Sequence, residues 1–569
     1  MKKHRINAVL WSAFLSAGLF APIAAAQAAA VVVPGSADAG RVDRRESEPQ
    51  TQIIPLPQIE SKQTLPSAEA PKGSEQIKVT LTDVRIAGMT VFSTEDIKGL
   101  YKPYLGREVT LDAVWKIADL LTKHYRDNGY FLSRVVVPQQ EMDGGIIGLR
   151  AIEGYVGDVQ FKDALSENKI VKAWTDKLLS YKPLTSDQIE NVLLGLNDLP
   201  GVNLRAIMQP MKNTEGTAGA VRLVLERKET PLATGTVSYD NYASRFLGPH
   251  EVQAQTQFVF WPTHKTTVHL LSSVPFTKVR YGGLRHEMPV FRGGTLELFG
   301  ANTTASPGYT LKSYDINSYS LTIGAALNYD IIRQRQENLR TRFVLEMRNT
   351  HADVLGDRLT KDNIRAARVK VGYQNADSLG GQNSVDATLS QGLNFLGASN
   401  PGEAYLSRAD ARPNFTKFNL DAFRLQSVSK NWDIFAAAAS QLSTTSLYSS
   451  EQFGYGGQAF GRSYDDSEIM GDYGVAASAE IRYMGLSDWN GLKIVPYPFY
   501  DVGAIWNIGD NATTQFETGS SAGAGFRLSS DFGLSGNFGF AFPLTRKADA
   551  PMYGNGCNPR FFWQVSYSF

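Results

Sequence analysis

Few residues in this sequence have the types and spacing that enzyme chemistry needs. The pairs His250-Glu251 and His286-Glu287 lack the second histidine that a zinc-peptidase motif places four positions after the first. A phosphate-binding G-x-x-x-x-G-K-[ST] loop does not occur either. The one cysteine, Cys557, excludes an internal disulfide framework and a multi-cysteine zinc site. We therefore expect a protein that is not an enzyme and that uses no metal or cofactor.

The residue with the clearest chemical role is Arg462, the single cation in the stretch 451–474, EQFGYGGQAFGRSYDDSEIMGDYG. This stretch joins two segments of alternating polarity, 433–440 and 475–483, and connections this long are usually functional or disordered. Its glycines and aromatic residues favour a loop folded back onto its own protein rather than disorder. An arginine offers a planar fork that fits a carboxylate. The carboxylates nearest in sequence belong to Asp465, Asp466 and Glu468.

The N-terminus reads as an export signal. Lys2, Lys3 and Arg5 precede an apolar run over 8–20, and small residues follow to Ala28. This pattern predicts a secretory signal peptide over 1–28; an N-terminal membrane anchor is the alternative, but the apolar run is short. With 57 basic and 56 acidic residues, the net charge of +1 gives no electrostatic reason to bind nucleic acid.

A linker with several prolines, over 29–75, follows the signal. Within it, 36–48 (SADAGRVDRRESE) predicts a short basic helix capped by Ser36, with plain linker as the alternative.

Two consecutive units then repeat the order β-α-α-β-β, over 76–153 and 154–230. In the first, the pattern predicts strands at 78–86, 130–137 and 146–152 and helices from 93 and 110. In the second, it predicts strands at 159–161, 204–208 and 221–226, a helix over 167–179, and another begun by a capping box of Thr185 and Gln188. Each unit of about 75 residues is below ordinary domain size. Any small α+β repeat would read this way.

From 231 to 569 helical periodicity gives way to alternation. Phe343, Leu345 and Met347 interleave with Arg342, Glu346 and Arg348. A soluble β-sandwich also alternates, but charged residues spaced through mid-strand fit the wet lumen of a transmembrane barrel better. About sixteen strands are expected, with long connections at 303–316, 351–362, 394–414, 451–474 and 546–558 on one side and short turns on the other. The predicted fold class is mostly β: a 16-stranded antiparallel transmembrane β-barrel preceded by two α+β units.

Several motifs together resemble the two-partner secretion transporters (TpsB type), which include the haemolysin activators and the filamentous haemagglutinin transporter. The pieces of the family's loop motif stand at 452–457 (QFGYGG), 461–464 (GRSY) and 471–474 (GDYG). The tetrapeptide departs from the family's V-R-G-Y/F pattern at Gly461 and Ser463. The family's F-x-D-x-G motif stands at 499–503 (FYDVG), and a D-N-x-G-like turn at 240–243 (DNYA) has Ala243 in place of glycine. The resemblance covers essentially the whole chain after the signal and identifies the two units as polypeptide-transport-associated (POTRA) domains.

The resemblance implies a lock between the loop and the barrel wall. Arg462 of the loop would pair with Asp501 of the wall, and the residues expected to complete the lock are Tyr464, Gly461, Phe499 and Gly503. Within a partly dry barrel, losing one partner of such a pair costs about 3–5 kcal/mol, against about 0–1 kcal/mol for an exposed pair.

The resemblance also implies the function: an outer-membrane pore that moves an unfolded exoprotein from the periplasm to the cell surface without ATP. The helix over 36–48 would plug the lumen until substrate arrives. The alternative is an insertase that assembles outer-membrane β-barrels, although relatives with that activity carry more POTRA domains. A passive solute porin would leave the POTRA repeat unexplained.

Expected partners are a TpsA-like exoprotein, outer-membrane lipid, and the barrel assembly machinery during biogenesis, with the transporter acting as a monomer. Open strand edges in POTRA domains suit capture of an extended chain. The candidate capture residues are Tyr130, Phe131, Leu132, Leu204 and Ile207, although packing between domains would explain the same pattern. Tyr567 and Phe569, at the end of the last strand, are the expected barrel assembly signal.

Overall fold

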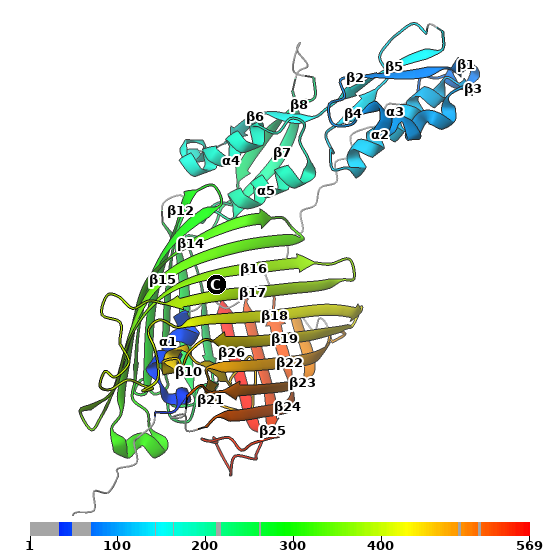
Figure 1. The fold of residues 1–569 in the computed structure, drawn as a ribbon. Helices are drawn as coiled ribbons and strands as arrows, with labels where there is room; N and C mark the ends of the chain where they lie inside the picture. The colour runs from blue at the N-terminus through cyan, green and yellow to red at the C-terminus, as the bar shows by residue number, and fades with distance from the viewer. Residues whose placement is uncertain are drawn as a thin grey trace, which may run out of the picture.

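The protein consists of two small α/β modules standing at one end of a large β-barrel (Figure 1). The structure is a computed structural model, and it describes residues 33–47, 70–142, 144–162, 164–211, 218–260, 263–486, 491–509 and 514–569. The predicted signal peptide over 1–28 lies outside these residues, as does most of the predicted linker. No helix in the described part of the chain is both long enough and apolar enough to cross a membrane.

Sixteen antiparallel strands close into the barrel, as the alternation predicted. Closure is made by β26 pairing with β9, from Gln564 opposite Asp240 to Ser568 opposite Thr236. The strands are β9 (Ala233–Asp240), β10 (Glu251–Phe260), β11 (His264–Ser273), β12 (Val279–Phe291), β13 (Gly294–Ala305), β14 (Asn317–Arg333), β15 (Glu337–Val354), β16 (Asp357–Ala376), β17 (Gly381–Gly392), β18 (Thr416–Ser429), β19 (Trp432–Ser443), β22 (Tyr473–Tyr483), β23 (Leu492–Trp506), β24 (Phe516–Ser530), β25 (Leu534–Pro543) and β26 (Arg560–Ser568).

Successive side chains of each strand face opposite sides of the barrel wall. On β15, Phe343 and Leu345 point outward and are 47% and 50% exposed, whereas Glu346 and Arg348 point inward and are buried. An apolar outer face with charged residues on the inner face is the arrangement of a barrel in lipid. The apolar side chains exposed on this surface are therefore those that lipid covers.

The connections are long at the end of the barrel away from the modules and short at the end near them, with one correction. The predicted long connection over 351–362 is wrong, because β15 runs to Val354 and β16 begins at Asp357. Leu355 (φ 51°) and Gly356 (φ 90°) form a two-residue turn with two positive φ angles, which matches the twist of paired strands. The polar residues that suggested a loop are paired across this extended hairpin, as Thr350 is with Asp362.

The first module has two sheets and two main helices. Its strands are β1 (Lys78–Leu81), β2 (Asp83–Ala87), β3 (Arg107–Thr110), β4 (Arg134–Val136) and β5 (Ile146–Ile152), and its helices are α2 (Thr94–Tyr101) and α3 (Asp112–Asp127). The predicted single strand over 78–86 is therefore split: its first part pairs with β3 and its second with β5. The apolar face of α3, including Val114, Ile117 and Leu121, packs on the sheet.

The second module repeats the arrangement. It contains β6 (Tyr155–Phe161), α4 (Lys169–Leu179), α5 (Ser186–Asn197), β7 (Leu204–Pro210) and β8 (Ala220–Arg227), with strand order β6-β8-β7. The predicted capping box is present: the Thr185 side chain accepts from the Gln188 backbone, and the Gln188 side chain accepts from the Thr185 backbone. The core of this module lies between the two helices and the sheet.

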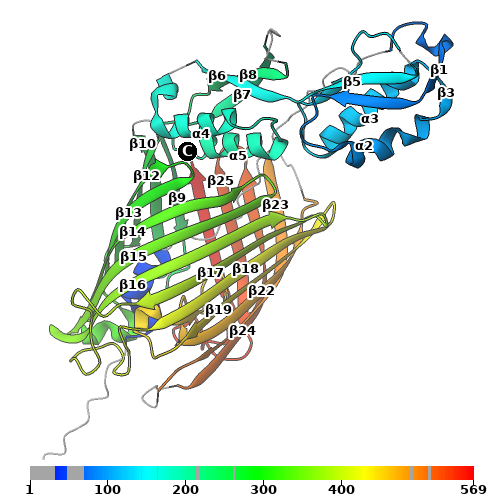
Figure 2. The ribbon, with the colours of Figure 1, turned by 45° about the horizontal axis from the view of Figure 1, so that its top comes forward.

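The basic helix near the N-terminus is α1 (Ala39–Ser47), and it lies inside the barrel against β12, β13 and β14 (Figures 1 and 2). It does not begin at Ser36, which belongs to a short 3-10 turn (Gly35–Ala37). The Asp38 carboxylate accepts the Gly40 N–H at 2.8 Å instead. An aspartate provides the same cap as a serine, here two positions later in the chain.

Candidate functional site

The loop between β19 and β22 folds into the barrel as a hairpin. Its two limbs pair as β20 (Phe453–Tyr455) and β21 (Ile469–Gly471). At its base, the buried Asp472 carboxylate accepts from Arg408 Nη2 at 3.0 Å and from the Leu447 and Ile508 N–H groups, both at 2.8 Å. The base of the hairpin is thereby fixed to its flanking segments.

Arg462, near the tip of the hairpin, is buried and forms a fork with Asp501 of β23. Its Nε lies 3.1 Å from Asp501 Oδ2 and its Nη2 lies 2.9 Å from Oδ1, while its backbone N–H also donates to Oδ2 at 3.1 Å. Nη2 also donates to Ser478 Oγ at 2.7 Å, and Nη1 donates to Glu480 Oε1 at 2.7 Å. The guanidinium carbon stands 3.7 Å from the centre of the Phe499 ring, within cation–π range.

The register of β22, β23 and β24 aligns the side chains of the wall that bind Arg462. Asp501 is opposite Ser478 on β22 and opposite Ser521 on β24, so three inward-facing polar side chains stand in one row. Ser521 Oγ donates to Asp501 Oδ2 at 3.3 Å, which helps to orient the carboxylate before the loop arrives.

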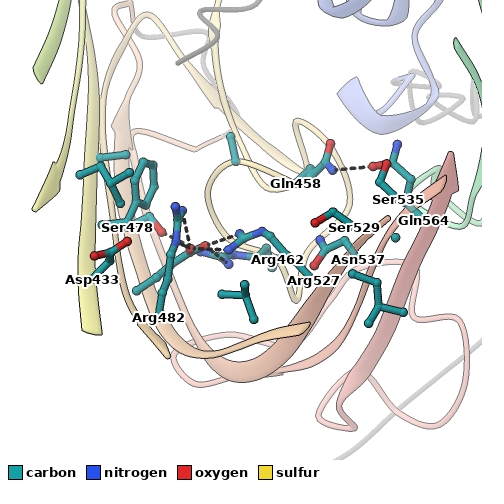
Figure 3. A pocket seen from close by; sticks show the side chains of 18 of the residues that line it. Asp433, Gln458, Arg462, Ser478, Arg482, Arg527, Ser529, Ser535, Asn537 and Gln564 are labelled. Carbon is teal, nitrogen blue, oxygen red and sulfur yellow. Dashed lines mark hydrogen bonds and ion pairs between the residues drawn. The ribbon is translucent and has the colours of Figure 1, made fainter. Parts of the chain in front are cut away.

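Glu480 gathers three arginines from the loop and the wall. Besides Arg462, its carboxylate receives Arg482 at 2.7 Å and Arg527 at 3.0 Å. Figure 3 shows the three guanidinium groups converging at the edge of a lumen cavity of about 650 Å³. Asp465 is not a partner of Arg462, because its Oδ1 lies 2.9 Å from Arg560 Nη1 on β26.

Three glycines, of which Gly461 and Gly503 belong to the motifs, leave room for the ring of Tyr455. A Cβ on Gly503 would lie 2.2 Å from Tyr455 Cδ2, and one on Gly519, opposite Gly503 in the sheet, would lie 2.4 Å from Tyr455 Cε1. Gly461 has φ +73°, and a Cβ there would lie 2.7 Å from Tyr455 Cζ. The buried Tyr464 donates its hydroxyl to the Ser520 carbonyl at 3.1 Å. The motif glycines therefore seat an aromatic side chain against bare backbone.

A second anchor, absent from the sequence prediction, joins the loop to a different part of the wall. The fully buried Glu451 carboxylate receives Lys417 Nζ of β18 at 2.6 Å, Arg368 Nη2 of β16 at 2.7 Å and Arg44 Nη1 of α1 at 3.0 Å. The Glu451 carbonyl also accepts from Lys417 at 3.1 Å and from Gln441 at 3.2 Å. In the sequence, inward-facing charged residues on strands cannot be told from ordinary lumen lining. The only feature that could have indicated this anchor is the charge of Glu451 at the start of the loop.

The helix α1 contacts both the loop and the wall. Arg41 Nη1 donates to the Gln452 carbonyl at 2.6 Å, and its Nη2 donates to Ser467 Oγ at 2.8 Å. Ala39 and Val42 pack against Leu271, Tyr281 and other apolar residues of the wall. The helix therefore lies between the loop and the wall at β12, β13 and β14.

The predicted capture residues of the first module are not on a strand. Strand β4 begins only at Arg134, and Tyr130, Phe131 and Leu132 lie in the turn between α3 and β4 within the first module. The predicted strand over 130–137 is therefore wrong for 130–133, whereas β4 itself is the last strand of its sheet. Tyr130 packs on the core of the first module, while Phe131 and Leu132 pack on the core of the second.

The predicted capture residues of the second module lie on β7, which pairs with β8 on one side and is the last strand of its sheet. Leu204 is buried and Ile207 is half-buried. At the end of β26, Tyr567 and Phe569 face outward and are 49% and 58% exposed, and the Phe569 backbone exchanges hydrogen bonds with Gly235 at 2.9 and 3.0 Å. The last residue of the chain therefore takes part in barrel closure.

No cluster of three or more histidine, cysteine, aspartate or glutamate side chains suited to a metal occurs within the described ranges. Cys557 is exposed in the connection between β25 and β26.

Comparison with known proteins places this geometry in context. The family model "Haemolysin secretion/activation protein ShlB/FhaC/HecB" matches residues 295–527, and the ShlB-type POTRA domain model matches residues 79–154. The heme/hemopexin transporter protein HuxB of Haemophilus influenzae (strain 86-028NP) is 22% identical over 486 residues, covering 83% of this chain and 84% of HuxB. The outer membrane transporter CdiB of Escherichia coli O6:K15:H31 (strain 536 / UPEC) is 23% identical over 578 residues, covering 95% of this chain and 91% of CdiB.

Solved structures share the fold. CdiB from Escherichia coli superposes with a TM-score of 0.70 at 19% identity, covering 88% of this chain and 92% of CdiB. BamA from Haemophilus ducreyi lacking POTRA domains 1–3 is more distant, with a TM-score of 0.50 at 13% identity, covering 86% of this chain and 100% of BamA.

Proposed function

Because this chain belongs to the haemolysin secretion/activation family of two-partner secretion transporters in the outer membrane, we propose that it moves an unfolded exoprotein from the periplasm to the cell surface through the lumen of its barrel. The family consists of transporters rather than enzymes, and its POTRA domains are periplasmic. The substrate is a TpsA-like exoprotein, and the modules at the end with the short turns stand where that chain enters.

The observation that carries the proposal is the buried fork between Arg462 and Asp501. A long loop inside a water-lined channel stays in place only if a directional contact holds it, and a two-pronged arginine–carboxylate pair supplies direction as well as energy. We propose that this lock, completed by Tyr464, Gly461, Phe499 and Gly503, keeps the loop on one side so that substrate can pass on the other.

The test is export of the exoprotein by cells carrying Arg462→Ala or Asp501→Ala. The barrel strands and their pairing do not depend on this contact, so both variants are expected to reach the membrane as folded barrels and to stop secretion. Arg342→Ala is the matched control, because Arg342 is also an inward-facing, paired arginine, but it pairs with Glu297 and lies away from the loop. Normal export by both lock variants would refute the proposal.

The second module is the proposed entry site. Strand β7 has an open edge in the described part of the chain, and an extended polypeptide can add to such an edge through backbone hydrogen bonds, with Leu204 and Ile207 close by. We propose further that the transporter works as a monomer. In this proposal the barrel assembly machinery recognises Tyr567 and Phe569 when it inserts the barrel.

Insertion of other barrels by this chain is the competing activity, and a reconstitution separates the two. Vesicles containing the chain alone are expected to take up an unfolded exoprotein. They are not expected to increase the folding of an unrelated outer-membrane barrel above that in empty vesicles.

A further inference from the structure

The carboxylate of Asp43 in α1 is held by hydrogen bonds and an ion pair from side chains of the barrel wall. Its Oδ1 accepts from Thr303 Oγ1 at 3.3 Å, and its Oδ2 accepts from Ser320 Oγ at 3.1 Å and Thr322 Oγ1 at 2.5 Å. Arg348 Nε lies 3.4 Å from the same Oδ2. All five side chains are fully buried, so the carboxylate has exchanged its water for three hydroxyls and a guanidinium.

The receiving residues belong to the wall and are positioned by strand register. Thr303 of β13 is opposite Ser320 of β14, and Thr322 of β14 is opposite Arg348 of β15. Arg348 Nε donates to Thr322 Oγ1 at 3.0 Å, so the Thr322 hydroxyl must direct its own hydrogen at the carboxylate. Three neighbouring strands thus hold the donors in place whether or not α1 is present.

Arg348 depends on Asp43 for part of its pairing. Its Nη1 and Nη2 are buried and make no hydrogen bond within the described residues, and its remaining counter-ion is Glu346, 3.2 Å from Nη2. Glu346 is shared with Arg368 at 3.4 Å. If α1 moved away, the wall would keep a positive charge and three hydroxyl donors facing the lumen, which together favour an anion.

We propose that this place on β13, β14 and β15 is a carboxylate-binding site for the exoprotein in transit, and that Asp43 occupies it in the resting state as a built-in competitor. The inference rests on the proposed function, because it names what the passing chain offers: an aspartate or glutamate side chain on an extended backbone. That carboxylate takes the position of Asp43, and its binding keeps α1 from returning.

The location of the site supports this assignment. The loop contacts the wall from β16 to β26, through Arg368, Lys417, Asp501 and Arg560. The helix α1 contacts the remaining wall, from Glu251 of β10 to Arg348 of β15. A chain that replaces α1 therefore passes directly over Thr303, Ser320 and Thr322.

The test measures current through the full chain in planar bilayers. Asp43→Asn keeps the shape of the side chain but removes its charge, so α1 is expected to leave more often and the open probability to rise. Two capped peptides, Gly-Ser-Gly-Asp-Gly-Ser-Gly and its asparagine counterpart, are then added on the side of the modules. In the Asp43→Asn chain the aspartate peptide is expected to block current at a concentration roughly tenfold lower than the asparagine peptide, as expected for charge-assisted hydrogen bonds.

Two further variants in the Asp43→Asn chain locate the block. Thr322→Val keeps the side-chain volume and removes the central hydroxyl, so the preference for the aspartate peptide is expected to disappear. Arg342→Gln removes another inward arginine of β15 and is expected to leave that preference unchanged.

Three outcomes would overturn the inference: equal block by the two peptides, loss of the preference in Arg342→Gln as large as in Thr322→Val, or an unchanged open probability in Asp43→Asn. Export of exoprotein by the native chain in cells is measured separately. Normal export, together with no preference for the aspartate peptide, would refute the carboxylate-binding site alone. Absence of export would refute the transport proposal itself.

Discussion

Single buried charges hold the loop, and each is satisfied by several partners. Removing a carboxylate or a lysine from water is costly, and the cost is offset only when all the partners are in place. Glu451 meets this condition with Arg368, Lys417 and Arg44, and Arg462 meets it with Asp501 and Glu480. Deleting one such group leaves the opposite charge buried without compensation.

Glu451→Gln is expected to destabilise the folded barrel by about 3–5 kcal/mol, because Lys417 and Arg368 lose their shared counter-ion in a buried site. The measurement is the urea dependence of the heat-modifiable folded band on a gel. Glu287→Gln is the control: its pair with Lys265 is 3.0 Å long but partly exposed, so the expected change is about 0–1 kcal/mol. Equal shifts for the two variants would contradict the role given to Glu451.

Gly503→Ala is expected to dislodge the loop although it adds only one methyl group, because the new Cβ would overlap the Tyr455 ring. Secretion is expected to fall strongly, and Gly503→Ala combined with Tyr455→Ala is expected to restore part of it. If Gly503→Ala alone secretes normally, the glycine is not needed to seat the ring.

Among the residues that hold the loop, Arg462 and Asp501 could be predicted from the sequence through two motifs, but Glu480 and Glu451 could not. Asp465 and Glu468 are much nearer to Arg462 in the chain than Asp501 is, so sequence distance alone favoured the wrong partners. Strand register decides the pairing, because it aligns Ser478, Asp501 and Ser521. That alignment depends on contacts between strands far apart in sequence.

Among the elements, α1 is held mainly by polar contacts to the loop and the wall. Those contacts can be exchanged for contacts to water or to another chain more readily than a large apolar face can. Its apolar contribution comes from Ala39 and Val42. The helix is therefore suited to leaving and returning without unfolding the barrel.

Deletion of 36–48 is expected to raise single-channel conductance in planar bilayers, because α1 fills lumen that water and ions would otherwise occupy. A deletion of equal length within 50–69 is the control, since it shortens the linker and keeps the helix. Unchanged conductance after deletion of 36–48 would argue against a plug.

Local signals predicted elements better than long-range ones. The capping box of α5 was predicted because Thr185 and Gln188 satisfy each other within one turn. The turn at Leu355 and Gly356 was missed because polar residues in strands that pair far from the barrel middle resemble a loop. The start of α1 was misplaced by two residues, because Ser36 and Asp38 are equally good caps in sequence.

The whole molecule is a barrel to which the second module is tied by specific contacts. Asp198, at the end of α5, receives Arg333 of β14 through two bonds of 2.6 and 2.8 Å, and Asn191 donates to the Arg333 carbonyl at 3.3 Å. The guanidinium of Arg292 also lies over the Trp174 ring of α4. The two modules are joined to each other by bonds such as Ser186 N–H to the Gly129 carbonyl at 2.9 Å. The sequence predicted the barrel from its alternation, but nothing local predicts where the modules sit on it.

Reversal of the pair between Asp198 and Arg333 tests this attachment. Asp198→Arg is expected to broaden the distance distribution between spin labels at Lys169→Cys and Arg280→Cys, both in a Cys557→Ser background, because two like charges replace the fork. Asp198→Arg combined with Arg333→Asp is expected to narrow the distribution again. A distribution that Asp198→Arg leaves unchanged would show that other contacts alone fix the module.

The loop is bound to the wall by ion pairs of Glu451, Arg462 and Asp465. These three contacts hold it along one side of the lumen. When α1 withdraws, the space it leaves is bounded by the wall from β10 to β15 and by the loop rather than by the full ring of strands.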